Sequence, residues 1–545
     1  IVENVTKRRS ARGMIWEPIT MGAALRAAAA QAGNQTFVVE ADRQERRYSF
    51  LEFDGMVDDL ARGLLGLGLK RGDLLALWMT NAPEWVLVWL AVARIGVVLA
   101  PINTRYKTEE AAYIIRQSEA KALIAMDRFW DIDYLAMIEE MRPSLPDLKT
   151  VAIWGDVAPP GMMALEALIL EGAKASVDLA AAEAAVTPDD PLIIVYTSGT
   201  TGQPKGAVHS HVTLRNAQNL CRAMHIEPGD VILGHMPFYH VAGAIAGLQP
   251  ALLQAGTLVT IAEWSPGHAL AVIARERVNI LGGIPTHFID LIDQKRVDPV
   301  DTTCLKSAWI GGADVSPTVA SAAYDLLGLD ALMAVYGMTE TSACTTLARF
   351  DDPLEVTCDN RGLPIGDYEV KVVDLETREP LPTGHDGEVC VRGHIVMLGY
   401  YRDKDASAAA IDADGWFKTG DLGRFDADGY LKITGRAKEM FIVGGSNAYP
   451  AEIERVLQAH AAVKQAVVVG APHPRLGEVC YAYVQLEDGV VEDASAITQW
   501  CKTRLADYKI PRTIAFIDDF PRTTTGKIQR FILADKVRLA AEGQA

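Results

Sequence analysis

A segment rich in glycine and hydroxyl side chains, residues 196–206, follows the apolar run 192–196 and reads Tyr-Thr-Ser-Gly-Thr-Thr-Gly-Gln-Pro-Lys-Gly. Glycine lets backbone N–H groups approach an anion closely, hydroxyls add hydrogen-bond donors, and Lys205 adds a positive charge. The spacing differs from the Gly-x-x-x-x-Gly-Lys-Ser/Thr pattern of P-loop proteins, and the density of such residues argues against a merely flexible turn. The segment therefore predicts a phosphate-binding loop of another type, to which we expect these residues to contribute: Thr197, Ser198, Gly199, Thr200, Thr201, Gly202 and Lys205.

The segment 336–340, Tyr-Gly-Met-Thr-Glu, ends another predicted strand and carries groups suited to the rest of a nucleotide. The ring of Tyr336 can stack on a base, and Thr339 can donate a hydrogen bond to a phosphate oxygen. Glu340 offers a hard carboxylate to Mg²⁺. A solvated loop carboxylate is the usual fate of glutamate, but a position just after a strand end favours the binding role.

Three further residues have side chains that could bind a nucleotide, but none of them alone identifies a nucleotide site. Asp421, at the end of Phe-Lys-Thr-Gly-Asp in 417–421, can accept hydrogen bonds from ribose hydroxyls, and Arg436 can reach the same ribose or a phosphate. Lys527 ends the run Thr-Thr-Thr-Gly-Lys of 523–527. In isolation each of these three side chains is typical of an ordinary solvated surface.

Taken together and in order, these motifs resemble those of the adenylate-forming superfamily, and the resemblance covers most of the chain. This superfamily includes acyl- and aryl-CoA synthetases, firefly-type luciferases and the adenylation domains of peptide synthetases. The matching segments are 196–206, 336–340, 417–421, Gly-Arg-Ala-Lys in 435–438 and Pro-Arg-Thr-Thr-Thr-Gly-Lys in 521–527.

The resemblance implies an ATP-dependent acyl-CoA synthetase that uses Mg²⁺ and coenzyme A. A carboxylate attacks the α-phosphorus of ATP and releases pyrophosphate, and the thiol of coenzyme A then displaces AMP from the acyl-adenylate. The protein must bring two anions together and disperse the charge on the phosphoryl oxygens. The resemblance assigns catalytic roles to Lys527, Thr200, Glu340 and His240, with Thr200 and Glu340 at the metal.

The resemblance also implies an α/β fold with two domains. A large N-terminal domain, 1–434, is expected to contain wound α/β sheets plus a small β-barrel, and a smaller hinged α+β domain, 435–545, to act as a mobile lid. Lys438 is the expected hinge. Rotation about it withdraws Lys527 and brings Gly444 and Gly445 to the pantetheine tunnel between the two half-reactions.

The acyl pocket follows from the same resemblance. Its small residues predict room for a ring or a medium-length chain, and its stretches contain no Arg or Lys to pair with a second carboxylate, so we expect a largely apolar monocarboxylic acid. His240 fits a buried core histidine as well as it fits an acyl-binding residue. We expect His209 and His211 to have structural roles. The expected acyl-binding residues are His240, Val241, Ala244, Ile284, His287, Gly311, Ala334 and Met338, and the expected nucleotide-binding residues on this side are Gly312, Ala313, Tyr336, Gly337, Met338 and Thr339.

The elements that must position these residues can be read from hydrophobic patterning. Short apolar runs alternate with helix-like stretches between 191 and 336, which predicts a wound, mostly parallel sheet with ligands at the carboxyl ends of its strands. After 352, short strands separated by Gly, Pro and Asp turns predict the antiparallel barrel. The expected buried strands are 192–196, 231–237, 258–262, 278–284, 307–311 and 332–336, with helices at 266–277 and 317–327.

Composition limits the remaining function classes. The 545 residues are 49% hydrophobic and carry a net charge of −18, which excludes a disordered chain and argues against a general nucleic-acid binder. The apolar stretch 85–93 is too short to span a bilayer and predicts a buried helix. The opening residues show no signal-peptide pattern, and seven scattered cysteines predict free thiols in a reducing cytoplasm.

Several alternatives stay open at this level. A stand-alone enzyme that loads a carrier protein and a luciferase-like oxidiser share the same motifs. A non-catalytic nucleotide-binding regulator is a third, although Lys527, Glu340 and Asp421 together oppose it. The resemblance also allows a homodimer.

Overall fold

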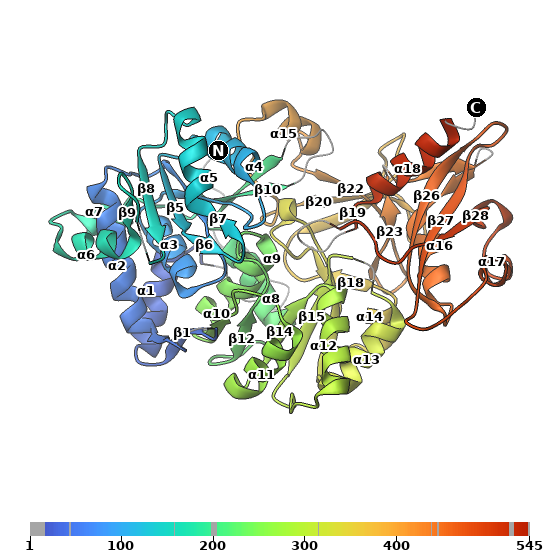
Figure 1. Cartoon of the computed structure of the whole chain (residues 1–545), viewed down its shortest axis with the longest axis horizontal. Helices are drawn as coiled ribbons and strands as arrows, with labels where there is room; N and C mark the ends of the chain where they lie inside the picture. Colours follow the sequence, from blue (N-terminus) through green and yellow to red (C-terminus); the bar gives the residue numbers. More distant parts are fainter. Residues whose placement is uncertain are drawn as a thin grey trace.

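The computed structural model comprises two large sheets with covering helices and a smaller sheet near the C-terminus (Figure 1). The structure describes residues 17–42, 45–156, 158–197, 204–313, 315–437, 439–443, 446–522 and 528–542.

The first sheet has eight strands in the order β21-β11-β10-β4-β3-β5-β8-β9. Its centre is parallel, and β10 and β11 add an antiparallel pair whose two ends meet at Thr197 and Lys205. The strands are β3 (Leu74–Trp78), β4 (Val98–Pro101), β5 (Ala122–Met126), β8 (Thr150–Trp154), β9 (Met163–Ala164), β10 (Pro191–Thr197), β11 (Lys205–Ser210) and β21 (Gly399–Tyr400).

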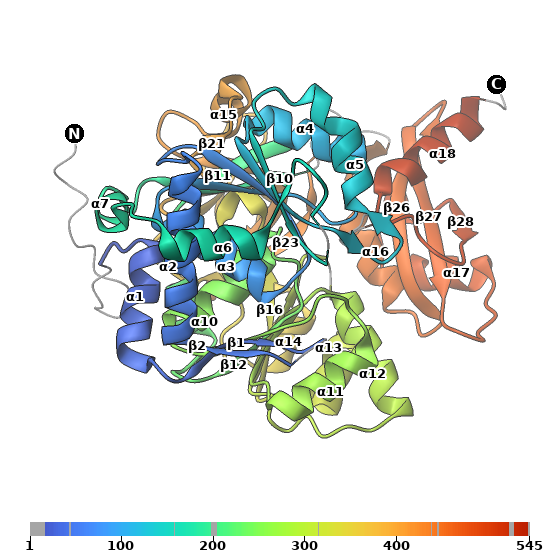
Figure 2. The ribbon, with the colours of Figure 1, turned by 60° about the vertical axis from the view of Figure 1, so that its left-hand side comes forward.

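Helices cover both faces of this sheet (Figure 2). The predicted buried helix is confirmed as α3 (Pro83–Arg94), in which Trp85 and Trp89 are fully buried and every residue but Glu84 is inside the core. The other helices of this region are α1 (Met21–Ala32), α2 (Phe50–Gly66), α4 (Thr108–Ser118), α5 (Tyr134–Met141), α6 (Leu165–Lys174), α7 (Leu179–Ala184), α8 (Thr213–Ala223), α9 (Val241–Gly243) and α10 (Gln249–Leu253), and the hairpin β6 (Arg128–Phe129) and β7 (Ile132–Asp133) stands apart.

The second sheet has thirteen strands, and its first half is parallel in the order β16-β15-β14-β12-β13-β1. The alternating pattern predicted β12 to β16 closely, because each is a short apolar run and β12 to β15 are each followed by a helix. The elements are β1 (Thr36–Glu40), β2 (Arg47–Ser49), β12 (Val231–Gly234), β13 (Thr257–Thr260), β14 (Ile280–Gly283), β15 (Ser307–Gly311) and β16 (Ala331–Tyr336), with α11 (Pro266–Glu276), α12 (Pro285–Val297), α13 (Pro317–Leu327) and α14 (Leu354–Cys358).

The second half of this sheet is antiparallel and occupies the stretch expected to form a small barrel. Its strands continue the parallel half without a break, and within the described residues no pairing between its first and last strands closes a barrel. The strands in pairing order are β17 (Thr346–Leu347), β18 (Arg361–Pro364), β23 (Leu431–Arg436), β22 (Phe417–Phe425), β20 (Gly387–Arg392) and β19 (Glu369–Val373), and α15 (Lys404–Ala410) lies beside them.

The C-terminal sheet buries both faces, because residues of β26 alternate between two cores. Val468 packs with α16 and α17, whereas Val467 and Val469 pack with Leu533 and Val537 of α18. The strand order is β25-β24-β27-β26, with β28 paired to β27. The elements are β24 (Phe441–Val443), β25 (Ser446–Ala448), α16 (Pro450–Gln458), β26 (Val463–His473), β27 (Gly477–Leu486), α17 (Ala494–Lys502), β28 (Thr513–Phe516) and α18 (Arg530–Glu542).

One expectation differs from the structure. The runs from 191 to 336 were expected to form one wound sheet, but β10 and β11 belong to the eight-stranded sheet and β12 to β16 to the other. Hydrophobic alternation specifies a strand but not its partner, so the division into two sheets is invisible in the pattern. Among the described residues, none of the helices has the length and apolar character needed to cross a membrane.

Candidate active site

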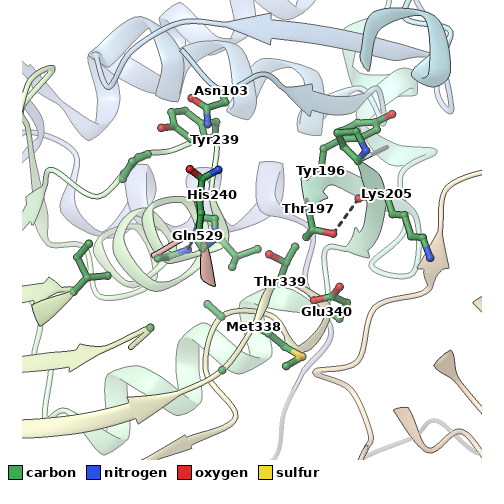
Figure 3. A pocket seen from close by; sticks show the side chains of 18 of the residues that line it. Asn103, Tyr196, Thr197, Lys205, Tyr239, His240, Met338, Thr339, Glu340 and Gln529 are labelled. Carbon is green, nitrogen blue, oxygen red and sulfur yellow. Dashed lines mark hydrogen bonds between the residues drawn. The ribbon is translucent and has the colours of Figure 1, made fainter. Parts of the chain in front are cut away.

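A cavity of about 2140 Å³ lies where the carboxyl ends of strands from both large sheets face the C-terminal sheet. Residues after β4, β10, β12, β14, β15 and β16 line it, and so do Gly470 of β26 and Gln529 just before α18. Figure 3 shows Thr197 and Lys205 on one side of this cavity and His240 on the other, with Thr339 between them. The cavity therefore unites most of the motif residues that the structure describes.

The ends of the predicted phosphate loop are positioned by the β10–β11 pair. Thr197 Oγ1 donates to the Lys205 carbonyl oxygen at 3.4 Å, and Lys205 Nζ lies 5.3 Å from the centre of the Tyr400 ring. Both Thr197 and Lys205 line the cavity. The other residues assigned to this loop, Ser198, Gly199, Thr200, Thr201 and Gly202, lie outside the described residues.

The turn after β16 is tightly packed and needs glycine at its start. A Cβ on Gly337 would lie 2.0 Å from the carbonyl oxygen of Ala343. The Thr339 carbonyl oxygen accepts a hydrogen bond from Nε2 of His209 at 2.7 Å, which fixes the tautomer of that neutral ring. Burial lowers the pKa of His209 to about 4. The histidine expected to be structural thus holds the Thr339 turn against β11.

Glu340 faces the cavity from the same turn (Figure 3). Its Oε1 accepts a hydrogen bond from the Tyr400 hydroxyl at 2.9 Å, and its backbone oxygen accepts from the Met397 N–H at 2.9 Å. No group of three or more His, Cys, Asp or Glu side chains in the described part of the chain could hold a metal ion by itself. A single oriented carboxylate fits Mg²⁺, which in nucleotide sites keeps several waters and takes its remaining oxygens from phosphates.

Asp421 is the most buried carboxylate of the site, with a side chain 5% exposed. Its Oδ2 accepts from the Tyr336 hydroxyl at 2.8 Å, and its Oδ1 pairs with Arg436 Nε at 3.0 Å. Burial and the charge of Asp421 raise the pKa of Tyr336 well above its usual value. These two contacts orient the Asp421 carboxylate, a group that accepts hydrogen bonds such as those of ribose hydroxyls.

The acyl side holds most of the residues named from the sequence. His240, Val241, Ile284, His287, Gly311 and Met338 line the cavity, as does Gly312 at a φ of +78°. His240 also caps α9, since its Nδ1 accepts from the Ala242 N–H at 3.2 Å. Among the described residues, four that were named from the sequence lie outside the lining: Ala244, Ala313, Ala334 and Tyr336.

Several lining residues carried no recognised motif. His235 directly follows β12, Trp264 lies four residues beyond the end of β13, and Asp290 lies on α12. Arg105 also lines the cavity, with its guanidinium carbon 3.6 Å from the centre of the Trp130 ring. Position just after a strand end was the available signal for the first two, but it applies to many residues that bind nothing.

Four C-terminal residues named from the sequence lie outside the described residues: the hinge Lys438, Gly444 and Gly445 of the second half-reaction, and Lys527 of the first. Their neighbours are described. Ile528 and Gln529 line the cavity, and Ile528 forms a β-bridge with Arg522.

Comparison with known proteins agrees with this geometry. Residues 25–401 match the AMP-binding enzyme family, and residues 452–527 match the AMP-binding enzyme C-terminal domain. The chain is 33% identical over 540 residues to the mitochondrial medium-chain acyl-CoA ligase ACSF2 of Bos taurus, covering 95% of this chain and 87% of the relative. It is 34% identical over 533 residues to the 3-[(3aS,4S,7aS)-7a-methyl-1,5-dioxo-octahydro-1H-inden-4-yl]propanoyl:CoA ligase of Rhodococcus jostii (strain RHA1), covering 96% and 100%.

A solved structure is similar along nearly the whole chain as well. The crystal structure of ATP-bound MatB from Rhodopseudomonas palustris matches with a TM-score of 0.84 and 29% identity, covering 95% of this chain and 98% of that one. The expectation drawn from the motifs is therefore confirmed. The chain belongs to the AMP-binding enzymes of the adenylate-forming superfamily, in the branch of AMP-forming acyl-CoA synthetases.

Proposed function

We propose that this acyl-CoA synthetase activates a largely apolar monocarboxylic acid of medium chain length or with an alicyclic or aryl ring. The observation that carries the proposal is one continuous cavity with two kinds of wall. Lys205, Glu340 and Asp421 supply charge at one end. Small and apolar side chains such as Ala246 and Ile284 supply the other end. The two relatives described above are named for a medium-chain acid and for an alicyclic propanoic acid, which supports this size range.

In the first half-reaction, a carboxylate oxygen of the acid attacks the α-phosphorus of ATP, and the bond to pyrophosphate breaks. Lys205 neutralises phosphate charge, and the Thr339 hydroxyl donates a hydrogen bond to a phosphate oxygen. Asp421 and Arg436 orient the ribose. Glu340 is the described residue that would hold Mg²⁺, which supplies positive charge to the phosphates when bound. Lys205, Asp421 and Arg436 lie on β-strands, and Thr339 and Glu340 lie on the turn after β16, so little reorganisation accompanies the reaction.

In the second half-reaction, the sulfur of coenzyme A attacks the acyl carbonyl carbon, the bond to AMP breaks and the thiol proton leaves to solvent. Lys527 must first leave the cavity. We propose that the lid 435–545 rotates about Lys438 against the body 1–434 for this purpose. The position of Gln529 in the cavity wall supports an arrangement in which segment 523–527 serves the first step. The β24–β25 pair, whose strands flank residues 444 and 445 in the sequence, would serve the second.

A direct test is incubation of the protein with ATP, Mg²⁺, coenzyme A and a panel of carboxylic acids, followed by mass spectrometry of the thioesters. We expect thioesters of medium-chain or ring-bearing monocarboxylic acids, and acyl-adenylates when coenzyme A is left out. A dicarboxylate as the best substrate would contradict the proposed monocarboxylic class. It would also point to Arg105, which lines the cavity, as the partner of the second carboxylate. Absence of both adenylate and thioester across the panel would overturn the function itself.

We also propose a reducing compartment, the cytoplasm, as the site of action. All seven cysteines lie in the described part of the chain and all are free, five of them buried, as is usual where disulfides do not form. A homodimer is a further proposal, and light scattering of the purified protein tests it. The expected small-molecule partners are the acid, ATP and coenzyme A.

A further inference from the structure

Three aromatic polar rings lie together in the wall of the cavity. His235, Trp264 and His287 line it together, with ring centroids 4.7 Å apart for His235–Trp264, 4.4 Å for Trp264–His287 and 5.0 Å for His235–His287. Trp264 Nε1 donates to Asp290 Oδ2 at 2.9 Å. We call these four residues the His–Trp cluster. Of these four, only His287 was among the residues expected in the acyl pocket.

The two imidazoles have hydrogen-bonding groups without partners. His235 is 7% exposed, yet neither of its ring nitrogens has a hydrogen-bond partner, and Nδ1 of His287 also lacks one. The Leu233 carbonyl lies near enough to His235 to favour its protonated form, but its geometry falls short of a hydrogen bond. Buried polar groups in native proteins are nearly always paired, and an unpaired one is costly to keep. Such groups in a binding cavity point to a ligand that supplies the partner.

Both rings are uncharged near neutral pH. Burial lowers the pKa of His287 to about 4, and burial together with His287 lowers the pKa of His235 well below its usual value. A neutral imidazole offers one N–H donor and one acceptor nitrogen. Two such rings match a hydroxyl or carbonyl oxygen rather than a carboxylate, which would require a cation.

The rings are held in place by residues outside the cluster. Asn81 donates to the carbonyls of Gly234 and Met236 at 3.0 and 2.8 Å, on either side of His235. Thr80 Oγ1 donates to the Ala262 carbonyl at 2.7 Å, two residues before Trp264. The positions of these polar rings are therefore built into the fold.

Sheet order places the cluster far from the reacting carboxylate. The adenylating turn follows β16, whereas the cluster follows β14, β12 and β13, which are two, three and four strands away. At about 4.8 Å per strand these offsets are about 10, 14 and 19 Å. An acid that fills the pocket would thus present its far end to the two histidines.

From this geometry we propose that the acyl pocket ends in a polar subsite, formed by His235 and His287, for a neutral oxygen substituent on the acid. The preferred substrate is a medium-length or alicyclic acid with a hydroxyl or ketone at the end remote from the carboxylate. This inference rests on the proposed function and narrows its substrate class.

The test compares matched acids that differ in one oxygen. Suitable pairs are octanoate with 8-hydroxyoctanoate and 3-cyclohexylpropanoate with 3-(4-oxocyclohexyl)propanoate. We expect kcat/KM for thioester formation to be at least about tenfold higher for the oxygenated member, because a site built to hydrogen-bond an oxygen rejects the analogue that lacks it. No preference, or a preference for the deoxy acid in both pairs, would overturn the polar subsite.

Variants of His235 and His287 test whether the His–Trp cluster causes the preference for the oxygenated acid. His235→Leu and His287→Leu should each bring the ratio of kcat/KM toward one or below, whereas His287→Gln, which keeps a donor and an acceptor, should retain part of it. His385→Leu, on the exposed turn between β19 and β20, is the matched control and should keep the parental ratio. Retention of the full ratio in both leucine variants would overturn the residue assignment. Failure of every acid to give a thioester would instead overturn the proposed function, so the two failures are distinguishable.

Discussion

The phenol of Tyr336 donates a hydrogen bond to Oδ2 of Asp421 at 2.8 Å, although four strand steps separate β16 from β22 in the sheet. In a flat sheet those steps would span about 19 Å. The antiparallel half must therefore curl back over the end of β16. This curl brings the expected ribose carboxylate beside the adenylating turn, and Tyr336 acts as the tie between them rather than as a lining residue.

Removing this tie should weaken nucleotide binding. Tyr336→Phe deletes one hydrogen bond to a buried carboxylate, worth about 1.5–3 kcal/mol for a charged acceptor, so kcat/KM for ATP should fall by roughly 10- to 150-fold. Acid-dependent exchange of labelled pyrophosphate into ATP measures this. Tyr430→Phe removes an equivalent bond to Asp352, which does not line the cavity, and should leave kcat/KM for ATP near the parental value. An equal loss in both variants would show that the tie serves stability alone.

Glu340 should govern the requirement for Mg²⁺. Glu340→Gln keeps the shape but removes the charge, and the Mg²⁺ concentration for half-maximal adenylation should rise at least about tenfold. Tyr400→Phe, which removes the hydrogen bond that orients Oε1, should produce a smaller rise in the same direction. Pyrophosphate exchange measured at fixed ATP and increasing Mg²⁺ gives the half-maximal Mg²⁺ concentration of each variant. An unchanged requirement in Glu340→Gln would exclude it as a ligand.

Lys527 should be needed for adenylate formation but not for thioester formation. Lys527→Ala should slow adenylate formation by at least about 100-fold, as expected when a group that stabilises transition-state charge is lost. Thioester formation from a preformed acyl-adenylate should stay near the parental rate. Lys536→Ala, on the exposed face of α18, is the control for loss of a lysine in the same region. Equal losses in both half-reactions would contradict the rotating lid.

Two buried histidines should make the fold acid-sensitive. Burial lowers the pKa of His209 and of His211 to about 4, whereas in the unfolded chain both titrate near 6.5. Between these values the unfolded state binds more protons, so the free energy of unfolding falls as pH drops from about 6.5 toward 4. At pH 5 each histidine should cost about 2 kcal/mol relative to pH 7.5.

Urea denaturation at pH 7.5 and pH 5.0 checks this. His211→Gln keeps an acceptor for the Met21 N–H, which bonds to Nδ1 of His211 at 3.0 Å, but cannot titrate. This variant should lose less stability on acidification than the parent, while His385→Gln at an exposed position should lose as much. A parental pH dependence in His211→Gln would contradict the assignment.

Local patterning predicted much of the fold because individual strands and helices are encoded locally. Strand β15 and helix α13 begin and end where the sequence indicated. The run expected to continue to residue 237 stops at Gly234, because the next residues form a loop in which the Met236 carbonyl accepts from Asn81 and the Phe238 N–H donates to Asn81 Oδ1. Such an ending depends on a residue more than 150 positions away and leaves no local trace.

The site was predicted unevenly for a similar reason. Motif residues such as Lys205, Glu340 and Asp421 could be named because each lies in a recognisable segment. The His–Trp cluster could not be named as a unit, since its rings follow three strands whose adjacency depends on the order β14-β12-β13. His287 was expected in the acyl pocket, but nothing local to it announces His235 and Trp264 as its neighbours.

The thirteen-stranded sheet has one last consequence. A single hydrogen-bonded ladder carries the far wall of the acyl pocket, the turn where the acid meets the nucleotide, and the strand that bears Asp421. Intervals along such a ladder are multiples of one repeat and cannot stretch independently. Relatives with the same sheet would accept longer or shorter acids by changing the size of the side chains at the ends of these strands, because the spacing of the strands is fixed.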